Sequence, residues 1–266
     1  RLTFSFSFHY LELRDRNLLE VFFKNINLVK QAGCSFLVQF NMYDEYIPHL
    51  EIMKQLCLDN VGAMPQIALT RDERSNEIKI LSNLSREAYY KLGKSFNSPL
   101  WNFTNKNFMV KRKEFCYAGD WSFRLDITTG KAKRCYFEDY TQNFYKDIDK
   151  PINFCAIGYG CELPYCINSS HFIALGDIPQ IKCPTYSELR NRKCNDGTEW
   201  EQPQMKDFLN TKLYQTNCRY IEEKGNNFLE NIFSVKYSKG AGLSRHRVIT
   251  ILGIRLKFKV KKCQIK

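Results

Sequence analysis

The chain has 266 residues, of which 44% are hydrophobic, enough for one large packed domain or two smaller ones. No run of about 18 apolar residues occurs, so no transmembrane helix is expected. The net charge of +12 is concentrated at the end, since residues 236–266 hold ten Lys and Arg and no acid. The main body therefore lacks the basic character of a nucleic-acid-binding protein, and no nucleic-acid partner is expected.

The sequence opens at Arg1 inside an apolar, strand-like run, so we expect a fragment whose upstream part is missing, with no signal peptide. Its 11 cysteines are odd in number, and five of them lie between Cys116 and Cys166. Clustered thiols without an export signal are more often metal ligands or core residues than disulfides. We therefore expect a cytoplasmic protein, with peripheral membrane contact as an additional hypothesis.

The first 75 residues alternate between strand and helix patterns. Strands are predicted over Leu2–Leu11, Ser35–Met42 and Met64–Thr70, and helices over Arg16–Gln31 and Ile47–Asn60. The strands recur roughly every thirty residues, which is the length of one βα unit. The pattern predicts an α/β fold with a parallel sheet, either open or closed into a barrel.

Shorter elements are predicted after this repeat. Ser85–Lys94 is expected to be a helix, and the segment 97–111, rich in Asn, Ser and Thr, a linker. Later elements are a hairpin of Trp121–Ile127 and Ala132–Phe137, an irregular segment Cys155–Pro184, a helix Pro203–Tyr220 and a terminal hairpin Val248–Val260. The expected domains are 1–96 (βα units), 97–111 (linker), 112–190 (cysteine-rich) and 191–266 (helical region and basic tail).

Four cysteines of the third domain form the strongest candidate site: Cys116, Cys135, Cys161 and Cys166. The predicted turn at Gly130 would bring Cys135 back toward Cys116, and the Gly- and Pro-rich segment would bring the other two close. Four converging thiolates bind either zinc or an iron–sulfur cluster, and spacing does not distinguish them. Four ordinary buried thiols are the alternative.

The predicted strands carry a second candidate site. Each has one polar side, whose residues lie toward the carboxyl end, where α/β folds bind ligands. The candidate cofactor-binding residues are Ser7, His9, Gln39, Asn41 and Gln66. The alternative, weighted equally, is that this side of the sheet simply faces water.

The spacing Cys116-(13)-Gly130-(4)-Cys135, followed by Cys161 and Cys166, resembles the SPASM or twitch auxiliary domain of radical S-adenosylmethionine (SAM) enzymes. The stretches Ser7–Leu13, Glu114–Phe123 and Pro164–Phe172 resemble radical SAM proteins of bacterial surface-polysaccharide loci. This resemblance implies the C-terminal part of a partial (β/α)6 barrel, an auxiliary [4Fe–4S] cluster on the four cysteines and SAM on the barrel. It also implies an electron donor and a small substrate such as a sugar or nucleotide-sugar.

The sequence departs from that family in one respect. The Cys-x3-Cys-x2-Cys motif that holds the SAM-binding cluster is absent, so this chain is not expected to cleave SAM. The intact protein would do so, forming a 5′-deoxyadenosyl radical that abstracts hydrogen from the substrate. Two alternatives stay open: a zinc-stabilised, non-enzymatic binding domain and an inactive truncated remnant.

The basic tail supports one further hypothesis. Arg255, Lys257 and Lys259 alternate with apolar residues, which predicts a strand with one basic face. A solvated edge strand protected from aggregation is the simpler interpretation. The functional alternative is attachment to an anionic membrane surface, to which each basic residue contributes about 1 kcal/mol.

Overall fold

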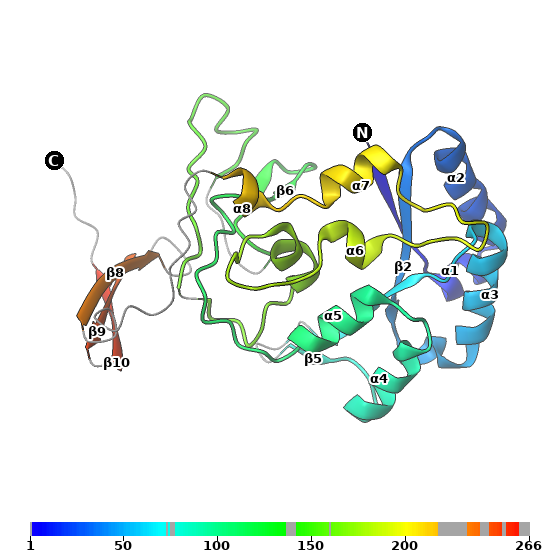
Figure 1. Cartoon of the computed structure of the whole chain (residues 1–266), viewed down its shortest axis with the longest axis horizontal. Coiled ribbons are helices and arrows are strands. Elements are labelled where there is room, and N and C mark those ends of the chain that lie inside the picture. The colour runs from blue at the N-terminus through cyan, green and yellow to red at the C-terminus, as the bar shows by residue number, and fades with distance from the viewer. Residues whose placement is uncertain are drawn as a thin grey trace. The chain divides into compact units, whose positions relative to one another are not determined.

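The computed structural model describes residues 2–72, 74, 78–136, 142–159, 161–217, 233–239, 245–251 and 254–260 (Figure 1). The chain divides into two units, each built from several segments. The first comprises Arg1–Val110, Pro164–Ser170 and Pro184–Thr211; the second comprises Lys111–Leu163, His171–Cys183 and Lys212–Lys266. After leaving the first unit, the chain therefore returns to it twice.

A parallel three-stranded sheet forms the centre of the first unit. Its strands β1 (Thr3–Ser7), β2 (Ser35–Met42) and β3 (Gln66–Leu69) are adjacent in chain order. The predicted α/β class with three parallel strands in sequence order is thus confirmed. Within the described residues the sheet is open and does not close into a barrel.

Helices connect the strands and cover the sheet. Helices α1 (Tyr10–Asp15) and α2 (Leu19–Gln31) join β1 to β2, and the 3-10 turn η1 (Asp44–His49) and α3 (Leu50–Val61) join β2 to β3. Figure 1 shows β2 with α1, α2 and α3 on one side and α5, α6 and α7 on the other. Phe8 at the end of β1 is fully buried and stacks on Phe22 of α2, with ring centroids 5.3 Å apart.

The start of the chain differs from the sequence prediction. The predicted strand Leu2–Leu11 ends at Ser7, and its last residues belong to α1. Arg16 pairs with Glu12 one turn earlier at 2.8 Å, a spacing that stabilises a helix. The aromatic alternation that predicted a long strand gave no sign of this turn. Helix α3 ends as expected, since Gly62 adopts a left-handed conformation with φ +74°.

Two serine-capped helices follow β3. Helix α4 (Arg86–Lys94) begins after Ser85, whose hydroxyl accepts from Ala88 N. Helix α5 (Pro99–Asn107) begins after Ser98, whose hydroxyl accepts from Trp101 N. The segment predicted to be a linker thus contains a helix, because a Ser-Pro start and buried apolar residues outweigh its polar composition. Short elements complete this unit: β4 (Arg71–Asp72) paired with β5 (Lys79–Ile80), α6 (Tyr186–Arg190) and α7 (Pro203–Leu209).

The second unit has mostly short elements. Strands β6 (Arg124–Asp126) and β7 (Lys131–Lys133) form the predicted hairpin, with Gly130 in its turn at φ +71°. A π turn, η2 (Ser169–Ile173), which begins in the first unit and ends in the second, interrupts the segment that was expected to be irregular. The predicted helix Pro203–Tyr220 is instead α7 and a separate α8 (Leu213–Thr216), and residues 218–220 lie outside the described residues.

The end of the chain forms an antiparallel sheet. The predicted terminal hairpin corresponds to β9 (Arg245–Ile251) and β10 (Ile254–Val260), which are paired along their whole length. A third strand, β8 (Phe233–Lys239), pairs with the other edge of β9 and was not predicted.

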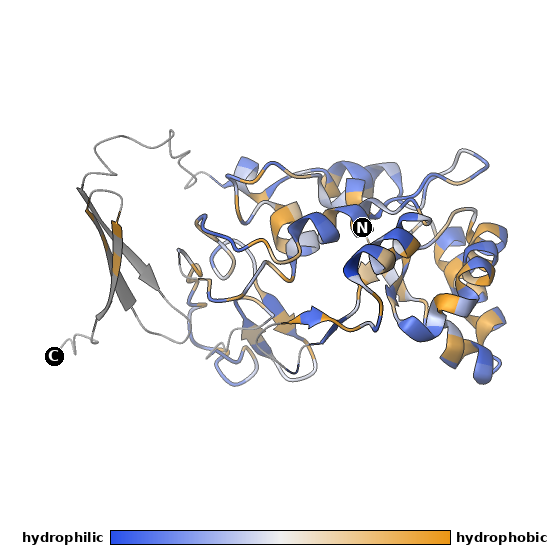
Figure 2. Ribbon diagram, turned by 90° about the horizontal axis from the view of Figure 1, so that it is seen from below, coloured by the Kyte–Doolittle hydropathy of each residue, from blue (hydrophilic) through white to orange (hydrophobic). Residues whose placement is uncertain are grey.

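The helices of the first unit are amphipathic. Figure 2 shows hydrophobic and hydrophilic residues sharing the same helices. In α2 the buried residues are Phe23 and Ile26, and in α3 they include Met53 and Cys57. These spacings of three and four residues place one face of each helix toward the core.

A glycine sets the contact between α4 and α5. A Cβ added at Gly93 would lie 2.2 Å from Cε2 of the fully buried Trp101. We predict that Gly93→Ala lowers the free energy of unfolding by about 1–3 kcal/mol, since overpacking outweighs the roughly 1 kcal/mol of helix propensity gained. Chemical denaturation measures this. Lys91→Ala, an exposed change in the same helix, is the control, and equal stability of the two variants would contradict the packing account.

Candidate functional site

The cysteine-rich part of the second unit is held together by backbone pairing. Cys116 N donates to Gly158 O at 3.3 Å, and Gly158 N donates back to Cys116 O at 2.9 Å. Ile157 N continues the ladder by donating to Ala118 O at 3.0 Å. The two segments are about forty positions apart in the sequence. This ladder therefore fixes the backbone around Cys116 against the segment that leads to Cys161.

Three of the four predicted ligands meet at one apolar cluster. Its buried members are Ala118, Cys135, Ile157 and Phe172, and Cys116 and Cys161 pack against it. We call these six residues the cysteine cluster. The hairpin positions Cys135, because this residue follows the end of β7 by two residues. The hairpin and the ladder thus bring three cysteines against the same apolar residues.

The fourth predicted ligand, Cys166, lies in the segment Pro164–Ser170, which belongs to the first unit. Its carbonyl oxygen accepts from Ser169 N at 3.1 Å. The preceding Tyr165 anchors this segment, since its hydroxyl donates to Ile78 O and its ring lies 4.8 Å from that of Phe108. His171, considered as an extra ligand, belongs to the second unit, with its ring 6.3 Å from that of Tyr136.

The thiols of the cysteine cluster fit a soft metal in their chemistry. None of the nine described cysteines forms a disulfide. Among the described residues, no group of three or more His, Cys, Asp or Glu side chains is arranged so that it could hold a metal ion.

Arg134 adds a positive charge beside a further thiol. Its guanidinium is almost fully buried and lies 3.6 Å from Sγ of Cys155 and 3.4 Å from the carbonyl oxygen of Ala156. Cys155 was not selected from the sequence, because nothing around it matched a motif.

A buried carboxyl group supports the loop that carries Cys116. Asp177 is fully buried, and its Oδ2 accepts from the Ser122 hydroxyl at 2.6 Å. Its backbone oxygen accepts from Tyr117 N at 2.8 Å. In the described part of the chain nothing donates to Oδ1. Burial, opposed only by the Ser122 hydrogen bond, raises the pKa of Asp177 to about 7.

The polar residues of the sheet occupy one row. In the strand register Ser7 lies opposite Gln39, which lies opposite Gln66. Ser7 and Asn41 are exposed, and Gln39 is half-buried. His9 follows β1 at the start of α1 and is also exposed. The row predicted from alternation is present, but the side chains of β1 and β2 in it face mainly solvent.

Gln66 differs from the rest of the row, because its side chain is fully buried and bonded within the protein. Its Nε2 donates to the carbonyl oxygens of Arg190 and Asn191, at 3.1 and 3.3 Å, and its Oε1 accepts from the Ser98 hydroxyl at 2.5 Å. These bonds join β3 to the start of α5 and to the end of α6. Gln66 therefore has a structural role here.

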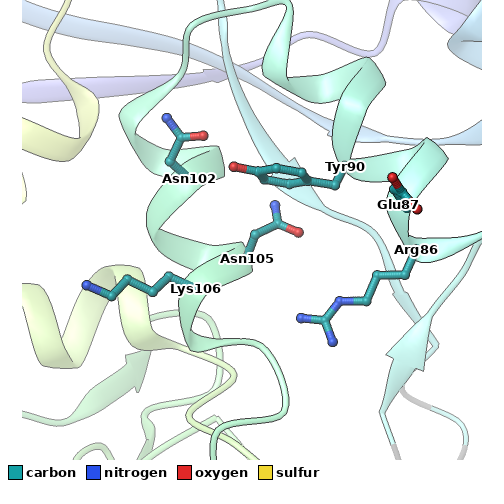
Figure 3. Close-up of a pocket in the computed structure, with 6 residues that line it drawn as sticks. All are labelled: Arg86, Glu87, Tyr90, Asn102, Asn105 and Lys106. Carbon is teal, nitrogen blue, oxygen red and sulfur yellow. The ribbon is translucent and has the colours of Figure 1, made fainter.

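A hollow that the sequence did not predict lies between α4 and α5, with a volume of about 490 Å³. In Figure 3, Arg86 reaches from α4 toward α5, and the Asn105 amide lies between it and the Tyr90 ring. Within the described chain, the side chains of Arg86, Tyr90 and Asn102 form no hydrogen bond or ion pair, although the Arg86 guanidinium lies 4.8 Å from the ring centroid of Phe108. The complete lining is Arg86, Glu87, Tyr90, Asn102, Asn105 and Lys106.

No family model, no curated protein and no solved structure matches this chain. Any functional assignment therefore depends on the residues themselves. The sequence pointed to the cysteine cluster through spacing and a turn glycine. It could not point to the hollow, because helix α5, which forms one wall, was expected to be a linker.

The raised pKa of Asp177 predicts a pH-dependent stability. Between its ordinary value of 3.8 and about 7, the folded protein binds this proton more tightly than the unfolded chain does. The contribution is therefore complete below about pH 4 and is lost as pH rises through 7, by as much as about 4 kcal/mol.

Asp177→Asn keeps an acceptor for Ser122 but cannot ionise, so we expect its stability to change less across this range. Urea denaturation at several pH values compares the two proteins. Parallel curves for wild type and variant would rule out Asp177 as the source of the dependence.

Proposed function

We propose that this chain is part of a radical SAM protein, in which the second unit holds an auxiliary [4Fe–4S] cluster. The observation that carries the proposal is the meeting of Cys116, Cys135 and Cys161 at one apolar cluster. The Cys-(13)-Gly-(4)-Cys spacing on a hairpin supports it. The parallel strands β1 to β3 support a contribution from the first unit as part of a (β/α)6 barrel.

The proposed ligands are Cys116, Cys135, Cys161 and Cys166. When bound, the cluster would supply an electron-transfer centre or an iron that binds substrate. The chain itself would provide an apolar surround through Ile157 and Phe172, which excludes water and thereby tunes such a centre. The ladder of Cys116 and Gly158 would hold the backbone that carries one of the proposed ligands.

The proposed substrate is a small molecule of the sugar or nucleotide-sugar class, and an electron donor is the proposed partner. Both follow from the family resemblance of Ser7–Leu13, Glu114–Phe123 and Pro164–Phe172. SAM would bind at the carboxyl ends of the strands in the intact protein, near Ser7 and Asn41. Because the Cys-x3-Cys-x2-Cys motif is absent from this chain, SAM cleavage is not proposed for it alone.

Anaerobic reconstitution tests the cluster. Incubation of the full chain with ferrous iron and sulfide should give a brown protein with broad visible absorption and about four irons per chain. Replacing Cys116, Cys135 or Cys161 with Ser should strongly reduce iron retention after desalting. Cys34→Ser, at a half-buried thiol of the first unit, is the matched control.

Two results would contradict the iron–sulfur assignment. A colourless protein that retains one zinc per chain would support the zinc-stabilised alternative instead. Equal iron retention by the Cys135→Ser and Cys34→Ser variants would show that the iron is bound elsewhere.

We also propose that the basic tail attaches the protein to anionic membranes, because residues 236–266 contain ten Lys and Arg. None of the described helices is long and apolar enough to cross a bilayer. Exposed Ile251, Ile254 and Leu256 on β9 and β10 offer apolar contact beside those charges.

Vesicle sedimentation tests the tail. The full chain should sediment with phosphatidylserine vesicles at low salt but not at high salt, because salt screens the attraction between the basic residues and the anionic lipid. A chain truncated before residue 236 should not sediment at either salt concentration, because it lacks those basic residues. Binding that is unaffected by salt, or equal for both proteins, would overturn the hypothesis.

A further inference from the structure

A lysine and a cysteine meet where the chain crosses between the two units. Cys183 is the last residue of the second unit before the segment Pro184–Thr211, and Lys212 is the first residue after it. Both residues belong to the second unit. Nζ of Lys212 lies 3.2 Å from Sγ of Cys183. The two crossing points of this segment are therefore in direct contact through their side chains.

The amine is held in place by other contacts. Lys212 is only 6% exposed, and its Nζ donates to the Ala174 carbonyl oxygen at 2.7 Å and to the Cys183 carbonyl oxygen at 3.4 Å. Sγ of Cys183 lies 3.1 Å from the Ile173 carbonyl oxygen, which fixes the thiol on the other side. Nitrogen and sulfur are thus held at hydrogen-bond distance by the same turn.

A glycine allows this close approach. Gly176 has φ +103°, and a Cβ at this position would lie 2.8 Å from Cδ1 of Tyr214 and 3.2 Å from Cβ of Lys212. The segment that begins at Lys212 can pass this close to the 173–177 turn only because residue 176 has no side chain. The pair is therefore built by the backbone as well as by its own hydrogen bonds.

We propose that Cys183 and Lys212 form a covalent N–O–S cross-link on oxidation by dioxygen. After the lysine has released its ammonium proton, the S–H bond and one N–H bond break, and S–O and O–N bonds form. One oxygen atom becomes the bridge, and the other leaves as water with the two hydrogens. Sulfur and nitrogen supply two electrons each, which accounts for the four that reduce dioxygen.

The cross-link would close the segment Pro184–Thr211 into a covalent loop at its two crossing points. Closing a loop stabilises a folded protein mainly by restricting the unfolded chain. The cross-link would thus make the stability of the folded protein sensitive to oxidant. Since no metal takes part in the step, it is independent of the proposed cluster.

The chain offers a matched comparison. Sγ of Cys155 lies 3.6 Å from a guanidinium nitrogen of Arg134, so it has a similar cationic neighbour. That neighbour is not a primary amine, and we expect no such cross-link there. Lys212→Arg keeps the positive charge and a donor for Ala174 but removes the reactive amine.

Peptide mass spectrometry of the full chain tests the proposal. Protein purified without oxygen is divided, one half is exposed to air, and both are alkylated and digested. Air should produce a joined peptide pair of Cys183 and Lys212 carrying one extra oxygen and two fewer hydrogens, which dithiothreitol separates. Cys155→Ser should leave the pair unchanged, and Lys212→Arg and Cys183→Ser should abolish it.

The unfolding temperature of the wild-type protein, measured in a thermal melt, provides an independent test. The air-exposed sample should unfold at a temperature several degrees higher, and dithiothreitol should reverse this. The proposal is overturned if Cys183 of the air-exposed wild type is recovered alkylated or as a sulfinic acid with no joined peptide. It is equally overturned if Lys212→Arg yields the same mass change.

Discussion

The first unit depends on how the returning segment Pro184–Thr211 satisfies buried polar groups at the start of β3. Arg192 donates to the carbonyl oxygens of Pro65, Phe96 and Asn97, at 2.7–3.1 Å. Gln66 donates in the opposite direction, to two carbonyls of the returning segment. Burial lowers the pKa of Arg192 to about 10, so the side chain is still charged at neutral pH. Both terminal nitrogens of this half-buried guanidinium donate to carbonyl oxygens, which offsets the cost of burying the charge, although Nε has no partner within the described residues.

The same return completes the hydrophobic core. Trp200 is almost fully buried, its ring lies 5.4 Å from that of Phe36, and its Nε1 donates to Val61 O. Its backbone oxygen accepts from Phe36 N, so the segment also forms a backbone hydrogen bond with the start of β2. These contacts make residues near 200 part of the same core as β2 and α3. A separate C-terminal domain would not show this mixture of apolar and backbone contacts.

Local patterns predicted local structure in this chain. The strand β2 was predicted with both of its ends, because Ser35–Met42 alternates and is followed by turn residues. The hairpin of β6 and β7 was predicted because Gly130 supplies a left-handed turn. Helix α5 was missed, since its Asn and Thr residues resemble a loop, whereas Leu100, Trp101 and Phe103 bury one face.

Long-range pairing could not be predicted in the same way. Nothing near Gln66 in the sequence indicates that its amide donates to the carbonyl oxygens of residues 190 and 191. A buried structural residue was therefore interpreted as a candidate cofactor-binding residue. The three thiols were grouped by spacing, but their common surface depends on the ladder between Cys116 and Gly158. Such partners are fixed by the tertiary fold, and composition near either residue contains no information about them.

Six of the nine described cysteines occupy three different physical environments, which indicates different roles. Cys57 is fully buried in α3, and burial raises the pKa of its thiol well above the ordinary value, so it is unreactive core. The thiols of the cysteine cluster share apolar neighbours with one another, which suits joint ligation of a soft metal. Cys155 and Cys183 each lie beside a cation instead. Of these two, only Cys183 has a primary amine as that cation, so oxidation chemistry can distinguish it from Cys155.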